Sequence, residues 1–379
     1  MNRYLIRLVA AVAGALTALL GASAVLAQAA APTAGADHAV FVQTNDPAGN
    51  SIVAYARHND GTLSWVATYP TGGNGARAAG AGVDPLATQG GLVIDSAHGL
   101  LLAANAGSNT VSAFGISGST LHLNQVTGSG GPFPNSIAVH GDLAYVLDGG
   151  FAGYVQGYRI AGGTLHPIEG SLRALGLGNG NPPAQSPGQV GFTPDGSKLV
   201  ITMKGNGGGS VYVYGVSPNG RLSETPAITT VGGNAFAFVF DPAGRLVIVN
   251  AAFGNLSTYR INGNGSLTLV SAGASDGQIA ACWVAVAGNH YYAANAGSGS
   301  LSQYAISPSG SVTLENPTAA TAIPGAIDMA ASSDGHFLYA QSGGSGTVKA
   351  FAVNGDGSLT FVGSWAIPDG GSQEGIAAA

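Results

Sequence analysis

The side chains of this sequence that could do chemistry stand mostly at the ends of short apolar runs. Seven such runs close on a polar residue, and these residues are Asn45, Asn105, Asp148, Lys204, Asn250, Asn295 and Gln341. An amide or carboxylate at a strand end often satisfies backbone groups of the following turn, so a structural role competes with ligand binding at each position. Asp148 and Lys204 depart from the amide pattern and carry charge, which makes them the better candidates for function.

These polar residues recur because the sequence itself repeats. The phrase LAANAGSNTVSAFGI at Leu102–Ile116 returns as YAANAGSGSLSQYAI at Tyr292–Ile306, with weaker copies at Val247–Ile261 and Leu338–Val353. Each phrase predicts two strands joined by a Gly- and Ser-rich turn. Repetition at a spacing of roughly 40–50 residues indicates a repeat architecture.

Each predicted unit has four strands, which we name inner, second, third and outer. The repeated phrase gives the second and third strands. The outer strand follows a tight turn such as Gly263–Leu267, and the next inner strand is an apolar run that ends in a turn, as in Gln189–Gly196. Seven units of four short antiparallel strands, without helical periodicity, predict an all-β seven-bladed β-propeller. A β-sandwich is the alternative, but it would not produce a regular repeat.

The two ends of the chain complete one unit. The run Ala39–Thr44 has the character of a second strand without an inner strand before it, and Gly375–Ala379 has the character of an inner strand without a partner after it. We therefore expect the C-terminal strand to close the ring against the N-terminal blade, which leaves no open sheet edge.

The N-terminus predicts export. Arg3 and Arg7 precede an apolar run, Leu8–Leu20, and a small-residue exit that ends at Ala27, which is the pattern of a Sec-type signal peptide. The run is too short and too rich in Ala and Gly for a good membrane span. We expect a signal peptide at 1–27, a tether at 28–36, one propeller domain at 37–379, and a secreted protein, periplasmic or extracellular, with no membrane segment after cleavage.

Charge and cysteine content narrow the classes of binding partner that the sequence favours. The net charge is −6 and is spread along the chain, so no basic stripe favours nucleic acid. Cys282 is the single cysteine, which excludes an internal disulfide, and its apolar surroundings indicate a small buried residue rather than a reactive thiol. We expect a monomer that binds a small molecule or a peptide at the central funnel.

The strand directions sort the candidates between two faces. Loops that join second to third strands and outer to inner strands share one face, the loop face, which surrounds the central channel. The histidines fall elsewhere in this register: His38, His58, His98, His122, His140, His166, His290 and His336. Neither an imidazole base, nor a Ser-His-Asp triad, nor a metal bound by histidine is therefore expected at the channel mouth.

The loop face does hold carboxylates and a few cations. The carboxylates are Asp46, Asp84, Asp148, Asp276, Asp369 and Glu374, with Asp328 within an inner strand, and the cations are Arg77, Arg173 and Lys204. We predict no cofactor and no metal site, with Ca²⁺ as the alternative because such a face is rich in oxygen ligands. Two long loops, 72–91 and 170–188, reach this face, and long loops in compact repeats are often functional.

The repeated AN-A-G-S turn and the TPDG and DPAG ends of the inner strands resemble the lactonase family of seven-bladed propellers, typified by bacterial 6-phosphogluconolactonases, and are also similar to YVTN-type surface propellers. Members of the lactonase family commonly carry a histidine just before an inner strand. The matching positions here are Gly188 (followed by Gln189), Asn135 and Glu374. The resemblance implies hydrolysis of a small lactone, with Glu374 and Arg173 in place of the imidazoles as base and anion clamp.

Two functions follow from these residues. In the first, Glu374 or Asp148 activates a water that opens a lactone ring, and Arg173 or Lys204 stabilises the carbonyl oxygen. The alternative is a non-catalytic propeller of the cell envelope or extracellular space that binds a ligand or a protein. The expected ligand-binding residues are Asn45, Asn105, Asn135, Arg173, Gln189, Lys204, Asn250, Asn295 and Gln341. Convergence of Glu374, Asp148 and Lys204 on one cavity would favour the enzyme, and their separation would favour the binding propeller.

Overall fold

The fold is that of a computed structural model, which describes residues 38–178, 185–205 and 208–379. All strands of the described residues belong to the unit Gly35–Ala379. The expected signal peptide and tether lie outside the described residues. Within the described ranges, no helix is long and apolar enough to cross a membrane.

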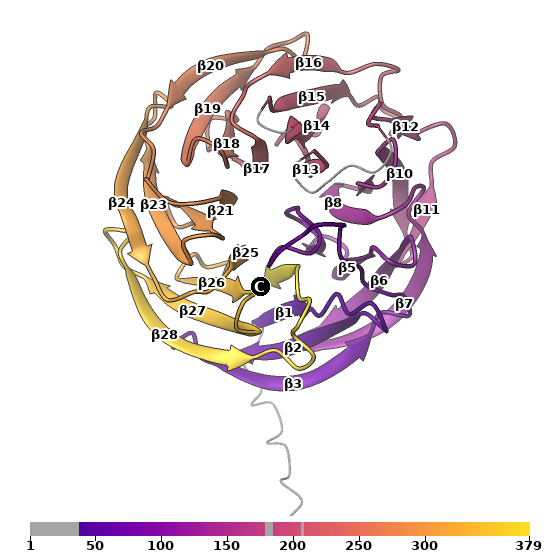
Figure 1. The fold of residues 1–379 in the computed structure, drawn as a ribbon. Coiled ribbons are helices and arrows are strands. Elements are labelled where there is room, and N and C mark those ends of the chain that lie inside the picture. The colour runs from indigo at the N-terminus through magenta and orange to yellow at the C-terminus, as the bar shows by residue number, and fades with distance from the viewer. Residues whose placement is uncertain (1–37, 179–184, 206–207) are drawn as a thin grey trace, which may run out of the picture. The chain divides into compact units, whose positions relative to one another are not determined.

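Seven antiparallel sheets form the seven-bladed propeller that the repeat predicts (Figure 1). From the inside outwards, blade 1 is β29 (Ile376–Ala378), β1 (Ala39–Gln43), β2 (Ser51–Arg57) and β3 (Leu63–Pro70). Blade 2 is β4 (Leu92–Asp95), β5 (Leu100–Asn105), β6 (Thr110–Ser117) and β7 (Thr120–Gly128). Blade 3 is β8 (Pro134–His140), β9 (Leu143–Asp148) and β10 (Tyr154–Ala161), with β11 (Thr164–Pro167) and β12 (Arg173–Ala174) both paired to β10.

The remaining blades are regular. Blade 4 is β13 (Pro187–Phe192), β14 (Lys198–Met203), β15 (Ser210–Gly215) and β16 (Ala227–Thr230). Blade 5 is β17 (Ala235–Phe240), β18 (Leu246–Asn250), β19 (Asn255–Ile261) and β20 (Leu267–Ala272). Blade 6 is β21 (Ala281–Ala287), β22 (His290–Asn295), β23 (Ser300–Ile306) and β24 (Val312–Ala320). Blade 7 is β25 (Ala326–Ala331), β26 (Phe337–Ser342), β27 (Thr347–Val353) and β28 (Leu359–Ala366).

The ring closes as the chain ends predict. β29 pairs antiparallel with β1, with Val40 opposite Ala378 and Val42 opposite Ile376. The last strand of the chain is thus the inner strand of the first blade. Removing an open edge in this way removes a template for pairing with another chain.

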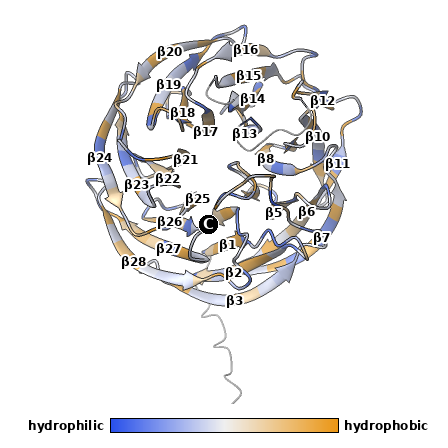
Figure 2. Ribbon diagram, in the orientation of Figure 1, coloured by the Kyte–Doolittle hydropathy of each residue, from blue (hydrophilic) through white to orange (hydrophobic). Residues whose placement is uncertain are grey.

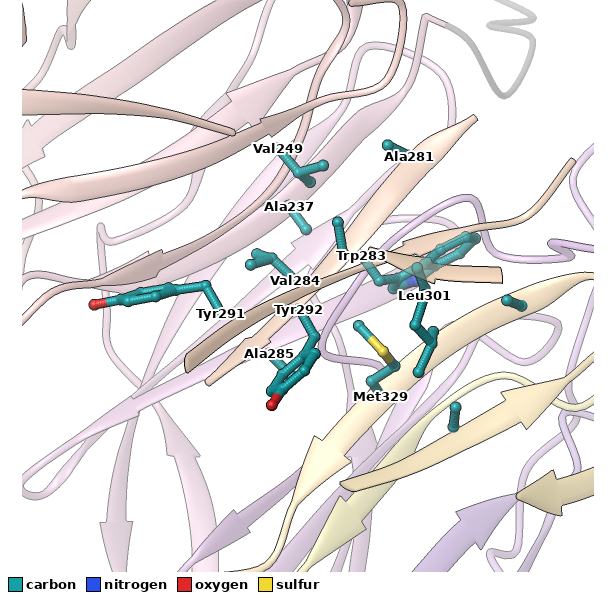
Figure 3. Packing of buried hydrophobic residues seen from close by; sticks show 14 of the residues in the cluster. Ala237, Val249, Ala281, Trp283, Val284, Ala285, Tyr291, Tyr292, Leu301 and Met329 are labelled. Carbon is teal, nitrogen blue, oxygen red and sulfur yellow. The ribbon is translucent and has the colours of Figure 1, made fainter. Parts of the chain in front are cut away.

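The hydrophobic core lies between neighbouring blades. The second strands are buried on both faces, as in β5 and β26, whereas the outer strands consist mainly of exposed and half-buried residues, as in β3. Figure 2 colours the strands by hydropathy, with apolar stretches in orange. The cluster around Trp283 joins residues of blades 5, 6 and 7, including Leu301 and Met329 (Figure 3). Every sheet is packed on both sides, which explains the Val-, Ile- and Ala-rich runs in the sequence.

A β-bulge interrupts five of the inner strands near the loop face. The register shifts lie between Pro134 and Ser136, Pro187 and Gln189, Ala235 and Phe238, Ala281 and Trp283, and Ile327 and Met329. A left-handed residue comes two positions before three of the bulged residues, at Phe133, Asn234 and Ala280. The repetition marks this turn as part of the blade's construction. A bulge changes the direction of the side chain of its extra residue. It therefore determines which side chain each bulged inner strand presents at the channel mouth.

Candidate functional site

The first long loop extends to the centre of the ring. Its second half, residues 83–91, which we call the central loop, precedes β4 (Figure 1). The Thr88 hydroxyl donates to the Gly188 carbonyl at 2.5 Å, and the Trp283 indole N–H donates to the Thr88 carbonyl at 2.8 Å. The Gln89 side chain exchanges two hydrogen bonds of 3.0 Å with the backbone of Val284. The central loop is therefore anchored to the inner strands of blades 4 and 6.

Glu374 anchors the same loop from blade 1. Its carboxyl oxygens accept the backbone N–H groups of Leu86 at 2.5 Å and of Thr88 at 3.2 Å. The side chain is only 1% exposed. Burial raises the pKa of Glu374 well above its usual range, and the neighbouring carboxyl of Asp84 raises it further. Glu374 is thus a buried support of the central loop with little direct access to a ligand.

Asp84 stands at the start of the central loop, beside Glu374. Its Oδ1 accepts the N–H of Ala87 at 2.7 Å, and its carboxyl group is hydrogen-bonded to that of Glu374. Burial raises the pKa of Asp84, while the hydrogen bond from Glu374 and the charge of Lys204 oppose the rise. Two adjacent carboxyl groups cannot both ionise easily, so we interpret Asp84 as the ionised member and Glu374 as the protonated one.

Lys204 follows β14 and completes the cluster. It is 2% exposed, its Nζ donates to the carbonyl oxygen of Ala87, and the nitrogen lies 4.6 Å from the centre of the Phe236 ring. Burial lowers the pKa of Lys204 to about 8, against the opposing charges of Asp84, Cys282 and Glu374. A lysine in such surroundings has both ammonium and neutral amine forms near neutral pH.

Asp84 and Lys204 share a pocket of about 270 Å³. Its lining residues are Asp84, Ala87, Lys204, Asn234, Phe236, Ala251, Ala252, Ala280 and Cys282. In the described part of the chain no ion pair joins the Asp84 carboxylate to Lys204. The charge of Lys204 nevertheless lowers the pKa of Asp84, and the charge of Asp84 raises the pKa of Lys204. Burial raises the pKa of the Cys282 thiol, which agrees with its interpretation as an inert wall residue. A mostly apolar pocket with a few convergent polar groups is the usual form of a small-molecule site.

The structure brings together only part of the predicted catalytic set. Glu374 and Lys204 interact electrostatically through the Asp84 cluster. Asp148 ends β9 in blade 3, where it is fully buried, packs against Gly131, and has no hydrogen-bond partner for its oxygens among the described residues. Burial raises the pKa of Asp148 well above its usual range. Glu374, Asp148 and Lys204 therefore do not converge on one cavity, an outcome that, for this set of residues, favours the binding propeller.

Arg173 lies away from the pocket. Its guanidinium donates to the backbone carbonyls of Gly170 at 2.9 Å, Leu222 at 2.7 Å and Ser223 at 3.0 Å. These bonds join β12 to the outer part of blade 4. The expected pairing of Arg173 with Glu374 is not seen, because Arg173 belongs to β12, which pairs with β10 in blade 3.

The expected ring of polar residues is present but buried. All seven members are at most 2% exposed, and the Asn members mostly bond within their own blade. Asn105, Asn250 and Asn295 each donate to a side-chain oxygen of the following third strand, at 2.8, 2.9 and 2.8 Å. Asn45 holds the start of the first long loop through Ala76, and Gln341 donates to the Gly375 carbonyl at 3.3 Å.

The remaining predicted ligand-binding residues join neighbouring elements. Gln189 accepts the N–H of Phe238 at 2.7 Å, which links β13 to β17. Asn135 is fully buried, and its amide donates to the Leu86 carbonyl at 3.5 Å. Its Oδ1 has no partner among the described residues. Asn135 thus faces the central loop, whereas Gln189 serves the packing of two blades.

Other chemistry is sparse at the loop face. None of the described pocket-lining residues there is a histidine, and His98 pairs instead with Asp95, at 2.6 Å, in an inner-to-second turn of the opposite face. The described residues include no group of three or more His, Cys, Asp or Glu side chains that could hold a metal ion. A hollow of about 720 Å³ on the opposite face is lined by Arg245, whose guanidinium is already paired with Asp241 at 2.6 Å.

Sequence reasoning missed two features of the site. Asp84 was one of several loop-face carboxylates, and only its position in the long Gly-rich loop distinguished it. Phe236 and Cys282 are in bulged segments of β17 and β21, and a bulge has no clear signature in a single sequence. Their alignment beside Lys204 depends on the packing of blades 4, 5 and 6.

Comparisons with known proteins agree with this fold. No protein-family model matches the sequence, and no curated protein matches it. Among solved structures, the periplasmic gluconolactonase PpgL of Pseudomonas aeruginosa is similar, with a TM-score of 0.69, 17% identity, and 90% of this chain and 98% of that chain covered.

Candidate 6-phosphogluconolactonases from two Bacteroides species are similar as well. The Bacteroides fragilis protein has a TM-score of 0.68 and 16% identity over 92% of this chain and 100% of that chain. The Bacteroides uniformis protein has a TM-score of 0.66 and 14% identity over 90% of this chain and 99% of that chain. The resemblance to lactonase-type propellers that the sequence indicates is confirmed for the fold, and at these identities the likeness concerns the fold alone.

Proposed function

We propose that the protein hydrolyses a small lactone in the pocket shared by Asp84 and Lys204. One observation carries the proposal: a carboxylate and a buried amine face the same cavity of about 270 Å³ without forming an ion pair. A lactone carbonyl between them would meet a proton acceptor on one side and a positive charge on the other. In this proposal Asp84 takes the role first expected of Glu374 and Asp148.

The Asp84 carboxylate would take a proton from a water that adds to the lactone carbonyl carbon. Its raised pKa suits a general base that works near neutral pH. The Lys204 ammonium would stabilise the negative charge that develops on the carbonyl oxygen, in a position fixed by its bond to Ala87. The ring C–O bond then breaks, Asp84 returns the proton to the leaving ring oxygen, and the hydroxy acid leaves. Glu374 acts indirectly, because it holds the central loop and keeps Asp84 ionised.

Three further observations support this proposal. Structures of similar fold include a periplasmic gluconolactonase and candidate 6-phosphogluconolactonases. The export pattern at 1–27 agrees with action outside the cytoplasm, where an unphosphorylated sugar lactone is a more accessible substrate than a sugar phosphate. The pocket also lies below the ~300–1,000 Å³ of drug-sized sites, which favours a substrate with a single ring.

The test is hydrolysis of glucono-1,5-lactone and γ-butyrolactone by the purified protein, measured as acid release above the uncatalysed rate. Lys204→Met should lower kcat by roughly 10²–10³, as for loss of an oxyanion donor. Asp84→Asn should lower it by roughly 10²–10⁴, as for loss of a general base. Lys198→Met is the matched control, because Lys198 begins β14 at the opposite face and should leave the rate unchanged. Absence of hydrolysis, or full activity in Asp84→Asn, would refute the proposal.

A second function is favoured by the central loop itself. The loop is anchored to blades 1, 4 and 6 by hydrogen bonds and so fills the place where a large ligand would enter. A non-catalytic propeller of the envelope could use this fixed surface to bind a small molecule or a peptide. In that case ligand binding would be detected by calorimetry in Asp84→Asn as well as in the natural protein, with no turnover in either.

A further inference from the structure

The Lys204 amine has the surroundings of a covalent carbonyl-binding lysine, a role that goes beyond lactone hydrolysis. It is 2% exposed, yet it lines a pocket of about 270 Å³. The rest of the wall is largely apolar, with Phe236, Ala251 and Ala252 among its residues. A lysine desolvated in an apolar pocket is a recognised form of activated amine nucleophile.

The position of the nitrogen is fixed from two sides. Nζ donates to the Ala87 carbonyl and lies 4.6 Å from the centre of the Phe236 ring. A neutral amine that donates one hydrogen in this way keeps its lone pair for attack on a carbonyl carbon. The fold thus holds the nitrogen in one place at the wall of the pocket, which is the positioning that covalent capture requires.

The charged and titratable groups that face Lys204 are Asp84 from the central loop, Glu374 from blade 1 and Cys282 from blade 6. Burial outweighs their charges and lowers the pKa of Lys204 to about 8. About one lysine in ten at this position is then neutral at pH 7, whereas an ordinary lysine amine is almost wholly protonated. The hydrogen-bonded pair of Asp84 and Glu374 provides an exchangeable proton beside the amine.

We propose that Lys204 captures small aldehydes or ketones in this pocket as an imine, with Asp84 moving the protons. The amine nitrogen forms a bond to the carbonyl carbon and gives a carbinolamine. The proton that Glu374 shares with Asp84 then passes through Asp84 to the carbinolamine hydroxyl, which leaves as water, and the nitrogen returns a proton to this carboxyl pair. The balance is one carbonyl compound and one amine giving one imine and one water, without an oxidant or a reductant. The pocket volume restricts the ligand to a small molecule with an apolar body.

The chain offers a test with internal controls, because its other lysines, Lys198 and Lys349, are partly exposed and lie outside this pocket. The full-length protein is incubated at pH 7 with butyraldehyde and cyanoborohydride, which reduces an imine to a stable amine, and the adducts are mapped by peptide mass spectrometry. We expect Lys204 to be alkylated at least about ten times faster than Lys198 and Lys349. In denaturant the difference should vanish. Equal labelling of the lysines in the folded protein would overturn the proposal.

The part played by Asp84 is tested with Asp84→Asn, which should slow labelling of Lys204 by about ten-fold or more without changing Lys349. Asp46→Asn, on the same face but outside the pocket, is the matched control and should leave all rates unchanged. Fast labelling that persists in Asp84→Asn would overturn the proton-transfer role. The same samples are assayed for lactone hydrolysis. Selective labelling without hydrolysis would remove only the proposed function, and hydrolysis without selective labelling would remove only this inference.

Discussion

The carboxyl groups of Asp84 and Glu374 are hydrogen-bonded to each other, although one belongs to the first long loop and the other to the segment before the last strand. Glu374 also accepts the N–H of Leu86, 288 residues away in the chain. One pair of side chains therefore joins the closure of the ring to the loop that forms the pocket. The ionisation of the Asp84–Glu374 pair therefore affects both the charge at the pocket and the hydrogen bonds that hold the central loop.

Asp84 and Lys204 together predict a bell-shaped pH dependence of lactone hydrolysis. The raised pKa of Asp84 means that activity falls as pH drops through that value and the base becomes protonated. The pKa of Lys204, about 8, means that activity falls again as pH rises above 8 and the ammonium is lost. The measurement is kcat/KM from pH 4 to 10, corrected for hydroxide hydrolysis. In Lys204→Arg the alkaline fall should disappear, because an arginine stays charged. An unchanged alkaline limb in that variant would assign it to another group.

Removal of Glu374 should loosen the central loop. Glu374→Ala leaves the buried N–H groups of Leu86 and Thr88 without acceptors, and each such loss costs about 1–3 kcal/mol. We expect a lower denaturant midpoint and faster hydrogen exchange at these two amides. Glu169→Ala changes an exposed glutamate and should stay within about 0.5 kcal/mol of the natural protein. Unaltered exchange at Leu86 in Glu374→Ala would show that other contacts hold the loop.

Gly188 leaves no room for a side chain at its inner-strand position. A Cβ there would lie 2.2 Å from the Phe236 carbonyl oxygen, and the Gly188 carbonyl already accepts bonds from Thr88 and Gln89. We expect Gly188→Ala to lower the free energy of unfolding by about 3 kcal/mol or more, since the neighbour is backbone and cannot move aside cheaply. Gly263→Ala is the control, because nothing lies within 4 Å of a Cβ at that glycine. Equal stability of the two variants in thermal and urea unfolding would contradict the prediction that a side chain at residue 188 clashes with the Phe236 backbone.

Asp328 predicts a pH dependence of stability rather than of activity. It is 3% exposed, and burial raises its pKa from 3.8 to about 7 although its oxygens accept the N–H groups of Met329 and Ile376. Because the folded-state pKa lies above the unfolded one, the stability that this group gives is complete below about pH 4 and is lost as pH rises through about 7. The full difference is on the order of 4 kcal/mol.

Asp328→Asn should therefore flatten the dependence of Tm on pH between 4 and 7 and raise Tm most at pH 8. Asn also tolerates the left-handed backbone of this position, where φ is 39°. Asp84 and Glu374 shift in the same direction, so part of the dependence should remain in the variant. A Tm profile that runs parallel to that of the natural protein would mean that Asp328 does not titrate in this range.

The fold could be predicted from the sequence because its signals are local and repeated. The phrase at Leu102–Ile116 and its copies give strand, turn and strand, and β-branched runs between Gly-rich turns give the sheets. The closure of β29 on β1 follows from counting, since one end lacks an inner strand and the other supplies one. Lys204 could be found in the same way, because it departs from its repeat, but Asp148 departs from the repeat as well and does not line the pocket.

The sequence by itself thus determined the seven blades, the ring closure and the departure of Lys204 from the repeat. Each of these follows from hydrophobic periodicity and turn residues, which are local patterns in the sequence. Only the tertiary structure decided that Asp84 and Phe236 join Lys204, that Asp148 and Arg173 do not, and that Glu374 supports a loop. These outcomes depend on the β-bulges of the inner strands and on the central loop, which forms hydrogen bonds with blades 1, 4 and 6. Contacts between residues hundreds of positions apart are set by packing, for which a single sequence has no local signal.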